Sequence, residues 1–213
     1  MVLLFIGPSG SGKDTQAQFL VNDFGYKRIS TGDLIRELVE GEHPTQLRIR
    51  NSLTKGFLPD GFVFGLLEIY LEKEENPNLI FSGAVRRITQ VELLDNVLSL
   101  TGKKVDKVVY FELSDEEAIK RMSSRYRCPK CQRNYNLQTN PPKVSLLCDI
   151  DQTPLTQRED DTVEGIKNRL EDFHKFNDDI ISEYEKRGVL LKIDASKDIE
   201  EVKSDLKELL SIN

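Results

Sequence analysis

A glycine-rich loop between an apolar run and a helical pattern constrains the fold of this chain more than any other feature. Residues 2–6, Val-Leu-Leu-Phe-Ile, form a short unbroken apolar run, which is typical of a strand buried on both faces. The apolar residues after the loop recur with helical spacing and predict a helix that opens near Lys13. The loop itself reads Gly7-Pro8-Ser9-Gly10-Ser11-Gly12-Lys13.

This strand–loop–helix context predicts a phosphate-binding loop. Glycines permit a tight turn whose backbone N–H groups face an anion, and the start of the helix adds partial positive charge. The lysine supplies a mobile charge for the β- and γ-phosphates of a nucleotide. A glycine-rich turn without a ligand is the alternative, but the full context favours nucleotide binding. The expected binding residues are Gly10, Ser11, Gly12, Lys13, Asp14 and Thr15, with Asp14 standing where the usual motif has Ser or Thr.

Strand and helix patterns alternate along the rest of the chain. Apolar runs predict strands at residues 79–81, 108–113 and 189–193, and helical spacing predicts helices beginning near residues 13, 31, 60, 114, 163 and 199. The expected caps are Asp60 and Ser114, the latter with Glu117 as a capping box, and the expected helix ends are Gly25 and Gly188. This alternation implies an α/β fold with a mainly parallel sheet covered on both faces.

Composition excludes several classes of protein. The 213 residues predict one main domain with small inserts, and 30 basic against 36 acidic residues give a net charge of −6. A chain this acidic has no electrostatic footprint for duplex nucleic acid. Its apolar runs are too short for a membrane span, and the first lacks the basic flank of a signal peptide. We therefore expect a cytoplasmic monomer that binds neither membrane nor nucleic acid.

The three cysteines fall in one irregular segment, residues 126–157, which also contains four of the eight prolines. Two pairs of potential ligands, each with two residues between its members, are separated as in a structural zinc ribbon. Free thiols without a metal are the alternative. The expected ligands are Cys128, Cys131, Cys148 and Asp151, and Tyr126 and Tyr135 are expected to pack beside them.

Several motifs, taken in chain order, resemble those of the adenylate kinase family. The resemblance covers essentially the whole chain and includes an insert of the long lid type between Arg125 and Arg158. The matching motifs are residues 7–17, Ser30-Thr31-Gly32-Asp33, Arg36, Leu58-Pro59-Asp60, Gly83-Ala84-Val85-Arg86, Gln90, Arg121, Arg125, Gln157-Arg158-Glu159-Asp160-Asp161 and Arg169.

The resemblance implies a P-loop NTPase-like sheet with two inserts and a defined reaction. The core would comprise residues 1–30, 60–125 and 159–213, the insert that binds the nucleoside monophosphate residues 31–59, and the zinc lid residues 126–158. The reaction would be reversible phosphoryl transfer from Mg·ATP to AMP, giving two ADP. The implied cofactors are Mg²⁺ with ATP and a structural Zn²⁺ whose four protein ligands leave no open position.

The resemblance also assigns roles to the arginines, whose guanidinium groups match phosphate oxygens. Arg121 would contact the donor nucleotide, and Arg36 and Arg86 would hold the α-phosphate of the acceptor. Arg125, Arg158 and Arg169 would converge on the transferred phosphates, so the implied catalytic residues are Lys13, Arg86, Arg125, Arg158 and Arg169. The implied AMP-binding residues are Thr31, Gly32, Arg36, Phe57, Leu58, Gly83, Arg86, Gln90, Arg158 and Arg169.

Two positions depart from the pattern of the family. Asp14 stands where the family has glycine, and Ser82 replaces an aspartate that holds waters around Mg²⁺. Asp14 either supplies part of the charge that Ser82 lacks or points into solvent. Three alternatives therefore stay open: a kinase for another nucleoside monophosphate, a nucleotide-binding homologue with impaired turnover, and a zinc-ribbon binder of nucleic acid, the last disfavoured by the acidic composition.

Overall fold

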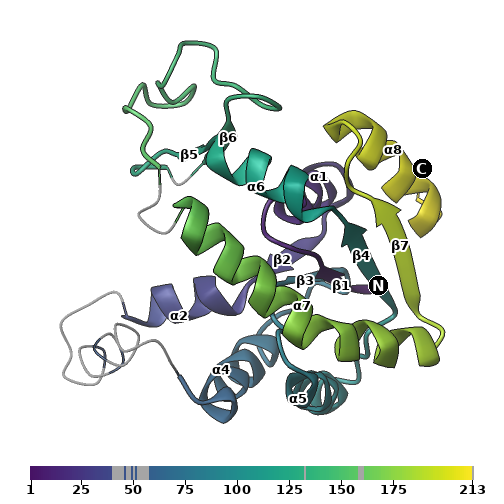
Figure 1. Cartoon of the computed structure of the whole chain (residues 1–213). Helices are drawn as coiled ribbons and strands as arrows, with labels where there is room; N and C mark the ends of the chain where they lie inside the picture. Colours follow the sequence, from purple (N-terminus) through teal and green to yellow (C-terminus); the bar gives the residue numbers. More distant parts are fainter. Residues whose placement is uncertain are drawn as a thin grey trace. The chain divides into compact units, whose positions relative to one another are not determined.

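The protein is described by a computed structural model that places residues 1–39, 46, 49, 51, 58–131, 133–157 and 161–212. Its largest sheet has five strands in the order β2-β3-β1-β4-β7 (Figure 1). Strand β1 pairs in parallel with β3 and β4, and β2 pairs in parallel with β3, which confirms the predicted α/β fold. The strands are β1 (Val2–Ile6), β2 (Lys27–Ile29), β3 (Leu79–Ser82), β4 (Lys107–Glu112) and β7 (Leu190–Asp194).

Strand β1 lies inside the sheet because all five of its side chains are apolar. Each of them is at most 3% exposed, and Leu3 lies opposite Ile80 on one side and Lys107 on the other. Fully burying an aliphatic or aromatic side chain stabilises a fold by about 1.5–3 kcal/mol. The loop that follows β1 therefore leaves the sheet from a firmly anchored point.

Helices alternate with the strands along the chain (Figure 1). Glycines end two of them in the left-handed region, Gly25 with φ of 68° and Gly188 with φ of 69°, as expected. In the part of the chain that the structure describes, no helix has the length and apolar character needed to cross a bilayer. The helices are α1 (Lys13–Phe24), α2 (Thr31–Val39), α4 (Asp60–Leu71), α5 (Ile88–Leu100), α6 (Asp115–Ser123), α7 (Val163–Lys186) and α8 (Ile199–Leu210).

The contacts divide the chain into two compact units. The first unit comprises Met1–Ile6, Ala17–Tyr110 and Phe176–Leu191. The second unit comprises Gly7–Gln16, Phe111–Lys175 and Lys192–Asn213. The glycine-rich loop, the cysteines and three expected phosphate-binding arginines, Arg121, Arg125 and Arg169, thus belong to the second unit. The residues before residue 91 that are expected to bind an acceptor belong to the first.

Three elements escaped the sequence prediction. Strand β2 has only three residues and two of them are basic, so no apolar run marks it. Helix α5 does carry a signal, because its buried residues Val91, Leu94 and Leu98 recur with helical spacing. The third is a small antiparallel hairpin of β5 (Arg125–Arg127) and β6 (Asn134–Asn136), which is too short for a periodic pattern.

The two expected helix caps have different outcomes. Asp60 was wrongly predicted as a cap, because Pro59 occupies the N-cap position and Asp60 is the first residue of α4. The carboxylate of Asp60 instead accepts a hydrogen bond from Gln90 Nε2 at 2.7 Å. Ser114 does cap α6, since its Oγ accepts from the N–H of Glu117. The Glu117 carboxylate accepts from Arg121 Nε at 3.0 Å.

Candidate active site

The glycine-rich loop has the backbone that its sequence predicts. Gly10 and Gly12 take φ values of 87° and 79°, a region that favours glycine. A Cβ atom added at Gly10 would lie 3.1 Å from Met122 Cγ and 3.2 Å from the carbonyl oxygen of Ala118. Glycine at this position therefore allows both the turn and the close approach of α6.

The side chains of the loop are arranged around its own backbone. Lys13 Nζ donates to the carbonyl of Pro8 at 3.2 Å, which holds the lysine across the loop. Ser11 is only 2% exposed, and its Oγ has no hydrogen-bond partner among the described residues. Asp14 and Thr15, at the start of α1, are exposed. Ser11 therefore offers a ligand its backbone rather than its side chain, while Lys13 and Thr15 can reach outward.

Arg121 joins helix α6 to the segment before α8. Its Nη1 donates to the carbonyl of Ala195 at 2.8 Å, and its Nη2 donates to the carbonyl of Ser196 at 3.0 Å. Gln16 Nε2 donates to the carbonyl of Ile199, the first residue of α8, at 2.9 Å. The helix that starts at the phosphate loop and the helix that carries Arg121 are thus fastened to one segment, residues 195–199.

Arg125 and Arg169 meet at a single carboxylate, that of Asp161. Arg125 donates from Nε at 2.9 Å and from Nη2 at 2.8 Å, and Arg169 donates from Nη2 at 2.6 Å. Burial alone would raise the pKa of Asp161, but the hydrogen bonds and charges of the two guanidinium groups outweigh it and lower that pKa. The structure thus brings two of the predicted phosphate-binding arginines together.

The expected acceptor residues lie in the first unit. Thr31 and Gly32 begin α2, Leu58 is half-buried, and Gly83 follows β3 with φ of 68°. Arg86 has an exposed side chain. Phe57 and Arg158 lie outside the described residues, as does the side chain of Arg36, whose backbone belongs to α2.

The amide of Gln90 forms hydrogen bonds through both its oxygen and its nitrogen at the start of α5. Its Oε1 accepts from the backbone N–H groups of Arg86 at 2.6 Å and Arg87 at 3.2 Å. Its Nε2 donates to Asp60 Oδ1 at 2.7 Å. Gln90 therefore fixes the turn between β3 and α5 in this structure, a role that the sequence did not suggest.

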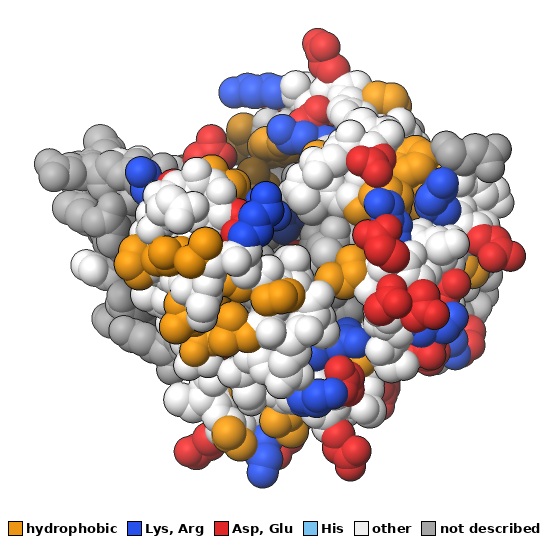
Figure 2. Space-filling model, turned by 90° about the horizontal axis from the view of Figure 1, so that it is seen from above, with side chains coloured by type: hydrophobic (Ala, Val, Ile, Leu, Met, Phe, Trp, Pro, Cys, Tyr) orange, Lys and Arg blue, Asp and Glu red, His pale blue; other side chains and the backbone are white. Residues whose placement is uncertain are grey.

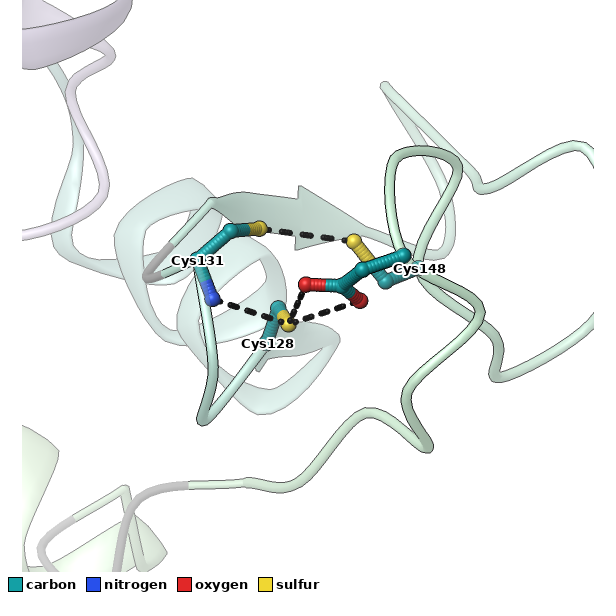
Figure 3. A group of neighbouring side chains, drawn as sticks. Cys128, Cys131 and Cys148 are labelled. Atoms are coloured by element: carbon teal, nitrogen blue, oxygen red, sulfur yellow. Dashed lines mark hydrogen bonds between the residues drawn. The ribbon is translucent and has the colours of Figure 1, made fainter.

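The cysteine-rich segment forms a compact cluster of potential metal ligands. The ligand atoms of Cys128, Cys131, Cys148 and Asp151 all lie within 4.8 Å of one another. Figure 3 shows the three thiol groups facing a common centre, with 3.4 Å between the Sγ atoms of Cys131 and Cys148. Bonds of 2.3 Å to a tetrahedral zinc ion would place such sulfurs about 3.8 Å apart. The donor set and its geometry therefore fit zinc.

The surroundings of the cluster support such a site. Tyr135 packs with Cys128, Cys148 and Leu155 in a small core, and Tyr126 lies against it, as expected. The Tyr135 hydroxyl lies 3.4 Å from Cys148 Sγ and accepts from the backbone N–H of Asp149 at 2.8 Å. Hydrogen bonds from Thr153 lower the pKa of Asp151 to about 2, so this carboxylate is ionised, as a metal ligand must be.

Two acidic residues of the matching motifs, Asp161 and Asp60, are hydrogen-bond partners that the sequence did not predict. Asp161 belongs to the motif that follows the cysteine-rich segment, and it lies two residues before α7, which carries Arg169 in its second turn. Asp60 stands next to the Leu-Pro motif. In both cases the sequence motif marks the acid, but its partner lies in a distant segment: Arg125 for Asp161 and Gln90 for Asp60. Only the structure shows these pairs.

The glycine-rich loop lies between a strand of a parallel sheet and the helix that follows it, and several arginines belong to the same unit as the loop. This combination is typical of the class of P-loop phosphotransferases. The family model described as adenylate kinase matches residues 5–189. The chain is 37% identical over 211 residues to the adenylate kinase of Hydrogenobaculum sp. (strain Y04AAS1), covering 99% of this chain and 100% of that protein. It is 36% identical over 213 residues to the adenylate kinase of Methanosarcina mazei, covering 99% of each.

A relative from Staphylococcus epidermidis, also an adenylate kinase, is 37% identical over 212 residues, 99% of each chain. The chain belongs to the adenylate kinase family. It is accordingly a transferase that acts on AMP with ATP.

Proposed function

We propose that this chain transfers the γ-phosphoryl group of Mg·ATP reversibly to AMP, giving two ADP, by means of the residues described above. The carrying observation is that the phosphate loop, Lys13 and three arginines of the family pattern lie in one compact unit. Phosphoryl transfer needs positioning and neutralisation of charge more than covalent chemistry. The acceptor phosphate oxygen is already anionic, so no residue of the protein needs to act as a nucleophile.

On the donor side, the N–H groups of residues 10–15 would bind the phosphates of ATP. Lys13 would exchange its bond to the Pro8 carbonyl for the β- and γ-phosphates. Arg121 would contact the donor nucleotide, and Arg125, Arg158 and Arg169 would stabilise the charge on the transferred group. The hydrogen bond from Lys13 Nζ to the Pro8 carbonyl supports this assignment, because it holds the ammonium group across the loop that would bind the phosphates.

On the acceptor side, Arg36 and Arg86 would hold the α-phosphate of AMP, and Thr31, Gly32, Phe57, Leu58, Gly83 and Gln90 would surround the nucleoside. A glutamine amide can donate and accept at once, which suits an adenine edge. Because Gln90 Oε1 already accepts two hydrogen bonds, accepting one from adenine requires it to give up a bond to the backbone of Arg86 or Arg87. Donation to adenine could use the second N–H of Nε2, beside the one bonded to Asp60.

Mg²⁺ would bind together with ATP and would neutralise negative charge on its phosphate groups. Thr15, which is exposed, would bind it through its hydroxyl. Asp33 would act through water, although its carboxylate forms an ion pair with Arg28 at 3.0 Å. Ser82 is buried at the end of β3, and its neutral hydroxyl is a weaker acceptor for metal-bound water than a carboxylate.

We further propose that Cys128, Cys131, Cys148 and Asp151 hold a structural zinc ion. The segment is short and has a core of few residues, so a metal would contribute much of its local stability. The division into a core (residues 1–30, 60–125 and 159–213), an acceptor insert (31–59) and a lid (126–158) is part of the same proposal, as are a cytoplasmic location and a monomeric state. Lys, Arg, Asp and Glu are interspersed on the face shown in Figure 2, which supports small-molecule partners over nucleic acid.

The decisive experiment measures ADP formation by the purified protein from ATP and AMP in the presence of Mg²⁺. The expected result is turnover with AMP well above turnover with CMP, UMP or GMP. Equal turnover with another nucleoside monophosphate would assign a different acceptor. Binding of ATP and AMP without formation of ADP would identify a homologue that has lost turnover.

A further inference from the structure

We infer that Asp161 is a positioning residue that holds Arg125 and Arg169 in the geometry required for phosphoryl transfer. This inference rests on the proposed function, because it takes both arginines to act on the transferred phosphates. It assigns to Asp161 itself no contact with either nucleotide.

The first support is the burial of the carboxylate between its partners. The Asp161 side chain is 1% exposed, whereas the side chains of Arg125 and Arg169 are 22% and 27% exposed. The three groups therefore form an arrangement in which the acid lies inside and the two guanidinium groups reach the surface. A ligand approaching from solvent would meet the arginines and not the acid.

The second support is the way in which Arg125 uses its guanidinium. Its bonds to Asp161 come from Nε and Nη2, the side edge of the guanidinium plane. A guanidinium has a second edge, formed by Nη1 and Nη2, that can bind another anion in bidentate fashion. The carboxylate thus fixes the plane of Arg125 and leaves that end edge for a phosphate.

The third support is the rigid attachment of Asp161 to helix α7. Thr162, the next residue, accepts from the N–H of Gly165 through its Oγ1 and from the N–H of Ile166 through its carbonyl. Arg169 Nε also donates to the carbonyl of Gly165 at 3.2 Å. The first turn of α7 therefore holds the acid and one of its arginines in a fixed relation.

Electrostatics explains why an acid is placed between phosphate-binding groups. Two guanidinium groups that point at one site repel each other, and a carboxylate between them removes this repulsion. The cluster keeps a net charge of +1, so it still attracts phosphate. The arginines are thereby oriented before the substrates bind, which avoids reorganisation during the reaction.

The test compares the steady-state kinetics of Asp161→Asn with those of the wild type. Asparagine has nearly the same shape but lacks the charge, so we expect kcat to fall about 100-fold, the usual effect of a small misplacement of catalytic groups. The KM values for ATP and AMP should change by less than about threefold. Asp161→Glu, which restores the charge, should recover part of the lost kcat.

A matched control and a double-mutant cycle separate positioning from general stability. Asp95→Asn removes a different acid–arginine bond, that between Asp95 and Arg187 at 2.6 Å, and should leave kcat unchanged. In the background of Arg169→Lys, Asp161→Asn should lower kcat far less than it does in the wild type, because one of the groups that it positions has already changed.

Each outcome has a distinct meaning. Additive losses in the cycle, or a Asp161→Asn enzyme whose folded fraction has the kcat of the wild type, would overturn the inference while leaving the proposed function intact. If Asp161→Asn does not fold, the comparison of Asp161→Glu with the wild type decides by the same criterion. Absence of ADP formation in the wild type would refute the proposed function and the inference with it.

Discussion

The two compact units treat their expected substrate-binding residues differently. In the second unit, Arg121, Arg125 and Arg169 are partly buried and each is held by several hydrogen bonds to carboxylates or carbonyls. In the first unit, the side chain of Arg86 is exposed, and the side-chain amide of Gln90 accepts a hydrogen bond from the backbone at the start of α5. The three arginines proposed to bind the donor and the transferred phosphates are therefore oriented before any nucleotide binds, whereas Gln90 must exchange hydrogen-bond partners to accept a bond from a base.

This difference has a physical origin. Charged groups that act on a developing negative charge are most effective when their orientation is already established. A residue that recognises a base can instead exchange one set of hydrogen bonds for another at little net cost, since each bond is replaced. Substitutions in the second unit should consequently affect kcat, and those in the first should affect the KM for AMP.

The largest effect is expected for Lys13→Ala, which removes the mobile charge of the phosphate loop. Loss of a preorganised group that stabilises transition-state charge should lower kcat by about 10²–10³-fold or more. Thermal unfolding should change little, because a hydrogen bond from a half-buried lysine to a backbone carbonyl, such as that to Pro8, contributes little net free energy. Lys104→Ala, at an exposed position of the first unit, is the control. Activity within threefold of the wild type would contradict the assignment of the loop.

The metal cluster should give the next largest effect, confined to the second unit. Elemental analysis should find one zinc ion per chain, and Cys148→Ser should lose it and expose residues 126–157 to hydrogen exchange, because binding free energy in such ribbons is folding free energy. Asp151→Cys should retain the metal, since thiolate and carboxylate both suit tetrahedral zinc.

Asp149→Asn is the matched control for the metal, because Asp149 accepts a bond from the N–H of Lys143 and is not among the expected ligands. Zinc that is retained in Cys148→Ser, or lost in Asp149→Asn, would refute the ligand set.

A smaller and more selective effect is expected for Gln90→Ala. Loss of the amide should weaken the binding of AMP by about 1–3 kcal/mol, which would appear as a higher KM for AMP. The KM for ATP should stay unchanged. Because Gln90 also caps the start of α5, a modest fall in melting temperature should accompany it. Gln18→Ala, which breaks an exposed bond to Asn22, serves as control. Equal changes for both nucleotides would place Gln90 outside the acceptor pocket.

The smallest effect concerns the pH dependence of stability. The pKa of Asp161 is lowered in the folded protein, so its ionised form stabilises the fold above the unfolded value of about 3.9. That contribution is lost as the pH falls below this value and through the lowered folded pKa. The difference in unfolding free energy between wild type and Asp161→Asn, measured by urea denaturation, should therefore be constant from pH 5 to 8 and shrink below about pH 4. A difference that stays constant down to pH 3 would contradict the ion pairs described here.

Local patterns were sufficient to predict much of this protein. The apolar run at residues 2–6, the glycines of the loop and the helical spacing after them depend only on neighbours in the chain, and the structure has the strand, the turn and the helix where the pattern predicts them. The ligand spacing around Cys128 and Cys148 is equally local, which explains why the structure brings these residues together.

Elements without a local signature could not be predicted in this way. Strand β2 is a strand because it pairs with β3, and its sequence Lys-Arg-Ile carries no period. The hairpin of β5 and β6 likewise depends on the fold of the whole cysteine-rich segment. Pairing across a sheet supplies hydrogen bonds that override weak intrinsic preference.

The sequence by itself determined the α/β class, the phosphate loop, the metal-ligand spacing and the family to which the chain belongs. Only the tertiary structure decided which groups share hydrogen bonds: Arg125 and Arg169 with Asp161, Gln90 with Asp60, and Arg121 with the segment before α8. The reason is that helices, turns and ligand knuckles arise from contacts a few residues apart. A side-chain bond between residues 30 to 75 positions apart depends instead on where the whole fold places each element.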